Sequence, residues 1–86
     1  MNFPEAEMPR NGSCRLCIVN QNIPKMVGQI TTVLANEDIN IEEMLNRHHE
    51  GLAYNIIDVD QSVTEDQIKK IKSIEGVIRV RAIPSE

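Results

Sequence analysis

Aromatic residues are almost absent from this sequence. Among its 86 residues Phe3 and Tyr54 are the only two, and there is no tryptophan. A hydrophobic core must therefore be built from Ile, Val, Leu and Met. The scarcity also argues against an RNA-binding domain that stacks bases on aromatic side chains of its central strands, because the apolar run 14–19 contains none.

An excess of basic residues, long apolar runs and numerous cysteines are also missing. The formal charge is −4 and both signs are spread along the chain, which leaves no basic surface for nucleic acid. No apolar run approaches the roughly 20 residues of a membrane span, so no membrane partner is expected. Two cysteines without a visible signal peptide predict free thiols and a cytoplasmic location. The length suits one small domain.

Residues 1–13 show no apolar period and contain Pro4, Pro9 and Gly12. Proline and glycine are typical of segments without regular structure, so we interpret this stretch as an extended leader or linker. We expect this stretch to be the tail of a larger protein, and the folded domain to span residues 14–86.

Cys14–Val19 is a short apolar run that predicts a central, buried strand. The stripe of an α-helix follows, with apolar residues at Met26, Val27, Ile30, Val33 and Leu34 in an amphipathic run that continues to Glu37. Pro24 fits the first turn of this helix, where its missing N–H is harmless. Asn22 is favoured over Ile23 as the N-cap, because asparagine is a strong capping residue.

A second strand is predicted over residues 39–48, although its apolar residues change parity between Ile41 and Met44. A β-bulge near residues 42–43 would reconcile the two parities, and bulges favour the edges of sheets. After a short turn, strong β-forming residues predict a third strand over residues 52–60.

The second helix has the clearest start signal. Residues Thr64–Gln67 fit a capping box whose two acidic residues complement the helix dipole. The apolar stripe that follows consists of Ile68, Ile71 and Ile74. Gly76 is placed to close the helix in the left-handed conformation. Residues 77–83 then predict a last strand, which Pro84 stops.

The resulting order, βαββαβ, predicts an α+β fold of the ferredoxin-like kind. Right-handed crossovers place two helices on one face of a four-stranded antiparallel sheet. The first and third strands then lie in the centre of the sheet, and the second and fourth form its edges.

Two pairs of residues are candidate metal ligands, Cys14 with Cys17 and His48 with His49. Residues three apart on a strand point to opposite faces, so the two sulfur atoms cannot share one ion, and adjacent histidines also diverge. Redox-active cysteine pairs lie at a helix N-terminus, which Cys17 does not reach. We therefore expect buried thiols, a solvated hairpin tip and no metal site.

Three asparagines, Asn20, Asn22 and Asn40, are predicted to lie at the ends of elements, where their amide groups are available for a ligand. A helix N-terminus facing the same turn would suit a carboxylate. The alternative interpretation is that they serve only as caps and turn residues. No nucleophile has a base beside it, so no catalytic residues are expected.

The run Leu-Cys-Ile-Val-Asn-Gln-Asn-Ile-Pro at 16–24, then a helix, then Ile39-Asn40-Ile41, resembles an ACT domain, the small-molecule regulatory module of amino-acid metabolism. The start, Met-Asn-Phe-Pro-Glu at 1–5 followed by Met8-Pro9, resembles the exit from the catalytic part of bacterial D-3-phosphoglycerate dehydrogenases into their ACT domain. Residues 74–81 resemble the last helix and strand of that family.

The resemblance implies a C-terminal regulatory domain that is not itself an enzyme. Residues 1–13 would then link it to a missing catalytic domain, which would bind NAD. This chain is expected to hold no cofactor, because it has no Gly-x-Gly-x-x-Gly turn. The resemblance also implies that L-serine, the end product of the pathway, binds between two ACT domains and inhibits the enzyme.

In the family that this chain resembles, the effector ligands are a His and an Asn around the first turn and an Asn that opens strand two of the partner. Asn22 and Asn40 match the second and third ligands, whereas Asn20 stands where the family has the His. The Pro-Gly of the family is Pro24-Lys25 here. The lysine side chain would either crowd a ligand or meet its carboxylate with an ammonium group.

We also predict a homodimer. The second strand opens at residues 39–41 and is expected to be an edge with unpaired N–H and C=O groups, so two copies can pair these edges about a two-fold axis. The alternative function is a ligand-independent domain that assembles dehydrogenase subunits.

Overall fold

The computed structural model describes residues 13–84. The elements follow in the order β1 (Cys14–Gln21), α1 (Met26–Asn36), β2 (Ile41–His49), β3 (Leu52–Val59), α2 (Glu65–Lys72) and β4 (Val77–Pro84). The predicted βαββαβ order is confirmed. The predicted linker, apart from Ser13, lies outside the described residues.

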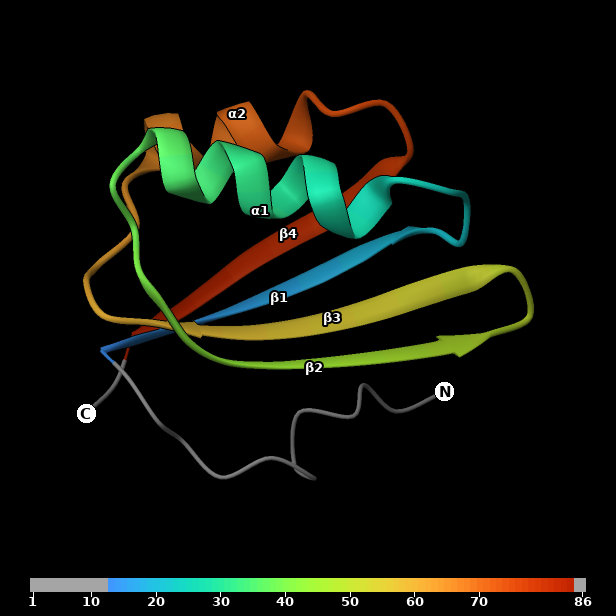
Figure 1. The fold of residues 1–86 in the computed structure, drawn as a ribbon, viewed down its shortest axis with the longest axis horizontal. Helices are drawn as coiled ribbons and strands as arrows, with labels where there is room; N and C mark the ends of the chain where they lie inside the picture. The colour runs from blue at the N-terminus through green and yellow to red at the C-terminus, as the bar shows by residue number, and fades with distance from the viewer. Residues whose placement is uncertain (1–12, 85–86) are drawn as a thin grey trace.

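The four strands form a single antiparallel sheet in the order β2-β3-β1-β4. Figure 1 shows both helices on the same face of this sheet. As predicted, β1 and β3 occupy the centre and β2 and β4 the edges. The core fills the space between the sheet and the helices, because the inward residues of both layers are aliphatic and each one stabilises the fold by about 1.5–3 kcal/mol when fully buried. Its fully or almost fully buried aliphatic members are Leu16, Ile18, Ile30, Leu34, Ile57, Val59 and Ile71.

The predicted β-bulge is present in β2. Ile41 pairs with Val59 and Glu43 with Asp58, which leaves Glu42 as the extra residue. The bulge restores the parity of the strand, since Ile41 and Met44 both pack against the core. β2 therefore keeps one apolar face although its sequence does not alternate regularly.

The start of α1 differs from the prediction. Its N-cap is Lys25, which adopts a left-handed conformation (φ 70°, ψ 5°) and forms no side-chain cap. These angles match the third position of a type II turn, with Pro24 in the second position, where its fixed φ is favourable. The chain therefore turns before the helix begins at Met26. The prediction of Asn22 as N-cap, with Pro24 inside the first helical turn, was wrong.

The start of α2 agrees with the prediction. The backbone N–H of Gln67 donates to Thr64 Oγ1 at 3.2 Å, and the N–H of Thr64 donates to Gln67 Oε1 at 2.9 Å. Gly76 has the predicted positive φ of 99°, but it does not close the helix, whose C-cap is Ser73. It lies instead in the turn before β4, where the N–H of Val77 donates to the carbonyl of Ile74 at 3.1 Å.

Candidate effector site

The first predicted ligand, Asn20, lies inside β1 rather than at its end, because the strand runs two residues further than expected. Its side chain is only 1% exposed. The amide nitrogen of Asn20 donates to the carbonyl of Gln21 at 2.8 Å, and its oxygen accepts from Asn55 Nδ2 at 2.6 Å. In the free chain Asn20 therefore supports the end of β1 from within and does not present its amide to solvent.

Asn20 belongs to a row of three asparagines that crosses the sheet. Asn55 in β3 is fully buried and donates to Asn20, while its own oxygen accepts from Asn46 Nδ2 in the edge strand β2. Asn46 and Asn55 are cross-strand neighbours, and Asn46 is exposed. The row connects the edge of the sheet to the turn that leads into α1. The only sequence signal for it was a polar residue, Asn55, in the middle of a strand that is mostly apolar.

The second predicted ligand, Asn22, follows β1 and is exposed. Its backbone N–H donates to the carbonyl of Gly51 at 2.9 Å, and the preceding N–H, of Gln21, donates to the carbonyl of Gly76 at 2.8 Å. Two neighbouring turns thus fix the backbone at this point. The side chain of Asn22 forms no hydrogen bond within residues 13–84, so its amide is available to a ligand.

The third predicted ligand, Asn40, directly precedes β2 and is also exposed. Asp60 fixes its backbone from both sides. The N–H of Asn40 donates to Asp60 Oδ1 at 3.2 Å, and its carbonyl accepts from the N–H of Asp60 at 3.0 Å. Its side-chain amide makes no hydrogen bond to any other described residue. Like Asn22, Asn40 thus has a backbone that is fixed by hydrogen bonds and a side-chain amide that is available to a ligand.

Asn22 and Asn40 lie at opposite ends of the sheet in one chain. Figure 1 shows the β1–α1 connection beside the β2–β3 turn at one end, and the α1–β2 connection at the other. Asn22 bonds to the β2–β3 turn, whereas Asn40 lies beside the far end of β3. Seven residue steps of about 3.3 Å along β3 separate the two ends by about 23 Å. One chain alone does not bring the three predicted ligands together.

The N-terminus of α1 carries unsatisfied positive character. It has no side-chain cap and no acidic residue in its first turn. The first N–H groups of a helix lack partners within the helix, and the macrodipole makes this end attractive to anions. Lys25 adds an ammonium group that forms no ion pair with any residue in 13–84. This end of the helix therefore suits a carboxylate.

The structure agrees with the expected location of the cysteines. Cys14 and Cys17 are both free and buried, at 3% and 5% exposure. His48 and His49 are exposed at the tip of the β2–β3 hairpin. Among residues 13–84 no group of three or more His, Cys, Asp or Glu side chains is arranged to hold a metal ion. None of the helices in this part of the chain has the length and hydrophobicity that crossing a bilayer requires.

No family model matches the chain. Over 85 residues it is 29% identical to D-3-phosphoglycerate dehydrogenase of Escherichia coli K12, and over 84 residues it is 26% identical to the enzyme of the same name from Haemophilus influenzae. Both matches cover 96% of this chain, but only 21% and 20% of the respective relatives. The chain thus spans about a fifth of the length of the curated relatives it matches.

Solved structures with the same fold include ACT domains. The ACT domain of GTP pyrophosphokinase from Chlorobium tepidum superposes with a TM-score of 0.70 at 21% identity, covering 84% of this chain and 97% of that domain. The regulatory subunit of aspartate kinase from Thermus thermophilus gives a TM-score of 0.69 at 9% identity, covering 85% of this chain and 51% of that subunit. The chain therefore has the fold of an ACT domain and is similar, over nearly its whole length, to about a fifth of D-3-phosphoglycerate dehydrogenase.

Proposed function

We propose that this chain is the C-terminal regulatory domain of a D-3-phosphoglycerate dehydrogenase and binds a small amino acid, with L-serine as the first candidate, between two paired copies. One observation carries the proposal. Asn22 and Asn40 each have a backbone fixed by hydrogen bonds and a side-chain amide that bonds to no other described residue. Both side-chain amides are thus available to a ligand, but the two residues lie at opposite ends of one sheet.

A two-fold axis between two copies would bring Asn22 of one chain close to Asn40 of the other. If two copies pair along β2 in an antiparallel manner, the start of one β2 lies beside the end of the other. Asn40 of the second copy would then approach the end of the sheet that carries Asn22. Two equivalent pockets result. Each is lined by the exposed Asn22 and the buried Asn20 of one chain and by Asn40 of the other.

The exposed edge of the molecule supports this pairing. β2 is an outer strand, and no residue in it is fully buried. An edge strand offers unpaired backbone groups to a partner. The free flank of α1 contributes apolar surface, since Val27 is 40% exposed and, by helical spacing, lies on the side opposite the residues that face α2. Pairing would bury both features.

The chemistry of the proposed pocket suits an α-amino acid. Side-chain amides donate and accept hydrogen bonds, so Asn22 and Asn40 can contact an ammonium and a carboxylate group at once. The uncapped N–H groups at the start of α1 favour the carboxylate end. A small pocket selects a small side chain. Closing the pocket would change the angle between the two domains, and residues 3–12, outside the described part, would carry this change to the catalytic domains.

Calorimetric titration with L-serine tests the proposal. Wild-type chain and Asn36→Ala, a control that removes an exposed asparagine at the end of α1, should bind with equal affinity, and Asn40→Ala should lose binding. Equal binding by wild type and Asn40→Ala would rule out the cross-interface pocket. Absence of binding of any small amino acid at about millimolar concentration would refute the sensing role.

A second function, dimerisation without a ligand, is favoured by one observation. Both amide atoms of Asn20 are engaged within the chain, although this position corresponds to an expected ligand. A stable dimer in sedimentation, combined with no amino-acid binding, would support this alternative.

A further inference from the structure

A groove runs along α1 on the side that faces α2. α1 has 11 residues and α2 only 8, and Lys70 of α2 pairs with Glu37, just beyond the C-terminal end of α1. The shorter helix therefore leaves the N-terminal part of α1 uncovered. The groove is open to solvent, has a volume of about 470 Å³ and is lined by Lys25, Gly28, Gln29, Thr32, Val33 and Ile74. This volume lies within the range of roughly 300–1,000 Å³ that small-molecule sites occupy.

Two residues of this groove are unfavourable for the stability of the fold. Lys25 holds a left-handed conformation, which is unfavourable for a residue with a Cβ atom. Gly28 lies inside α1, where glycine is about 0.5–1 kcal/mol less favourable than alanine. A Cβ atom at Gly28 would meet nothing within 4 Å, so the fold does not need the glycine for a close contact. What the glycine does keep is open space at this wall of the groove.

The polar groups of the groove have capacity left for a ligand. The Lys25 ammonium has no ion-pair partner within residues 13–84. Gln29 Nε2 makes only a long contact, 4.0 Å, to the sulfur of Met26. The hydroxyl of Thr32 donates to the carbonyl of Gly28 at 2.7 Å, which leaves its oxygen free to accept.

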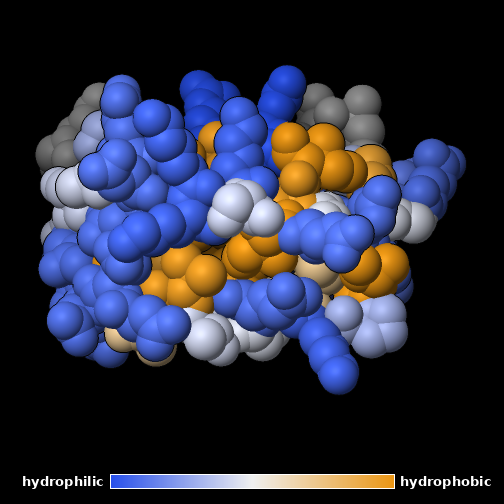
Figure 2. Space-filling model, turned by 90° about the horizontal axis from the view of Figure 1, so that it is seen from above, coloured by the Kyte–Doolittle hydropathy of each residue, from blue (hydrophilic) through white to orange (hydrophobic). Residues whose placement is uncertain are grey.

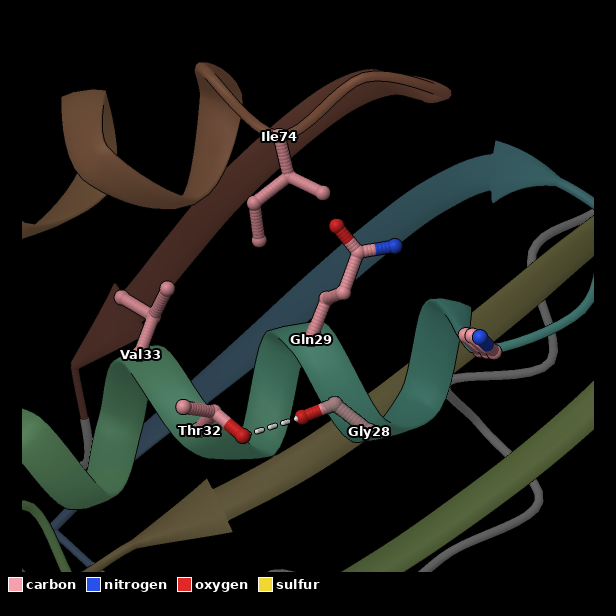
Figure 3. Close-up of a pocket in the computed structure, with 6 residues that line it drawn as sticks. Gly28, Gln29, Thr32, Val33 and Ile74 are labelled. Carbon is pink, nitrogen blue, oxygen red and sulfur yellow. Dashed lines mark hydrogen bonds between the residues drawn. The ribbon is translucent and has the colours of Figure 1, made fainter.

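The other lining groups are aliphatic. Figure 3 shows Ile74 extending from the segment after α2 toward Gln29 and Val33 of α1. Figure 2, which views the helix-covered side, shows hydrophobic atoms exposed between the hydrophilic side chains of this face. One cation, one amide and one hydroxyl beside aliphatic walls match a molecule with one carboxylate and a short hydrocarbon part.

We propose that this groove is a second binding site, separate from the interface pocket, and that it takes a small aliphatic monocarboxylate. The carboxylate pairs with the Lys25 ammonium and the Gln29 amide, and the hydrocarbon part lies against Val33 and Ile74. The groove is on the α2 side of α1, whereas the pairing surface described above includes the opposite flank with Val27. The two sites therefore lie on different flanks of α1 and share only Lys25 at the start of the helix.

NMR titration of the ¹⁵N- and methyl-labelled 86-residue chain with sodium isovalerate tests the site, and isovaleramide provides an uncharged control of the same shape. Isovalerate should give saturable shifts at Gly28, Gln29, Val33 and Ile74 with a Kd of about 1 mM or weaker, and the amide should not. Lys25→Gln should weaken isovalerate binding about fivefold or more, as expected for loss of an ion pair. Lys72→Gln, which removes an exposed lysine outside the groove, should leave it unchanged.

A second variant tests the location. Gly28→Leu should abolish the isovalerate shifts while Tm does not fall, because the added side chain enters open space. Unchanged binding by either Lys25→Gln or Gly28→Leu would overturn the proposal, as would shifts centred on Asn22 and Asn40. Asn40→Ala should bind isovalerate normally even if it loses serine, so the failure of one site is distinguishable from the failure of the other.

Discussion

The two helices begin in opposite ways. α2 starts at a complete capping box, in which Thr64 and Gln67 satisfy each other's backbone N–H groups, and its first turn contains Glu65 and Asp66. α1 starts at a left-handed Lys25, with neither a side-chain cap nor an acidic residue. The start of α2 is therefore capped by side chains of its own segment. The start of α1 has no side-chain cap, so its N–H groups keep their positive partial charge.

This difference supports the proposal that a ligand binds near the start of α1. A capping box occupies the donors that an anion would use, so the start of α2 contributes stability alone. The start of α1 departs from the local rules for helix starts, and such departures concentrate at functional or strained sites. It is held in place instead by contacts from distant parts of the chain, through the turns at Gly51 and Gly76 and through the asparagine row.

If contacts from distant parts of the chain hold the start of α1 in place, a substitution at the centre of the asparagine row should cause the largest loss of stability. Asn55→Ala removes the partner of Asn20 and leaves the buried amide oxygen of Asn20 unsatisfied, so the free energy of unfolding should fall by about 2 kcal/mol. Urea denaturation measures this loss. Asn46→Ala, at the exposed end of the row, should lose less than about 1 kcal/mol. Equal, small effects at both positions would show that the row does not support the turn.

The caps themselves provide the next test. Thr64→Ala should lower the free energy of unfolding by about 1 kcal/mol, because it removes the capping hydrogen bond of α2. Asn22→Ala, in the segment before α1, should change it by less than about 0.5 kcal/mol, because Asn22 caps nothing. A loss of similar size at Asn22 in urea denaturation would mean that α1 is capped after all.

The left-handed conformation of Lys25 predicts a substitution that increases stability. Lys25→Gly should raise the free energy of unfolding by about 0.5–1 kcal/mol, since glycine adopts a positive φ without steric strain. Lys69→Gly, the same exchange inside α2, should lower it by a similar amount, about 0.5–1 kcal/mol. Thermal unfolding of the two variants should thus show shifts of opposite sign, and a loss of stability in both would contradict the strained start of α1.

The smallest effect should come from the ion pair between the helices. Lys70 Nζ lies 2.7 Å from Glu37 Oε2, and the hydrogen bond from Lys70 lowers the pKa of Glu37 below its ordinary value of 4.5. Because the pKa is lowered on folding, the contribution is present above pH 4.5 and disappears as the pH falls through the lowered value. Glu37→Gln should therefore have a slightly lower Tm than wild type at neutral pH, and the two curves should converge in acid. A difference that persists in acid would exclude this ion pair as its cause.

The sequence predicted those parts of the fold that depend on short-range patterns. The order of helices and strands, the bulge at Glu42 and the capping box at Thr64 follow from periodicity and local side-chain chemistry, and all three are confirmed. The turn before α1 was missed because Lys25 has no intrinsic preference for a positive φ. Only the tertiary contacts that hold the turn impose it.

The candidate site was predicted in part, for a related reason. The sequence indicated the exposed asparagines, Asn22 and Asn40, at the positions where their side chains are available. It did not indicate that Asn20 is buried, because β1 extends two residues beyond its apolar run and Asn55 lies 35 residues away. The groove beside Gly28 depends on the relative lengths of two helices, which local patterns do not define.

The central claim is that one pocket takes Asn22 from one chain and Asn40 from the other, and complementation between variants tests it most directly. Asn22→Ala and Asn40→Ala should each fail to bind L-serine in calorimetry. Refolded together in equal amounts, half of the dimers are mixed and each mixed dimer has one intact pocket of two, so about a quarter of the wild-type sites should return with wild-type affinity. No recovery in the mixture, or full binding by either variant alone, would contradict the shared pocket.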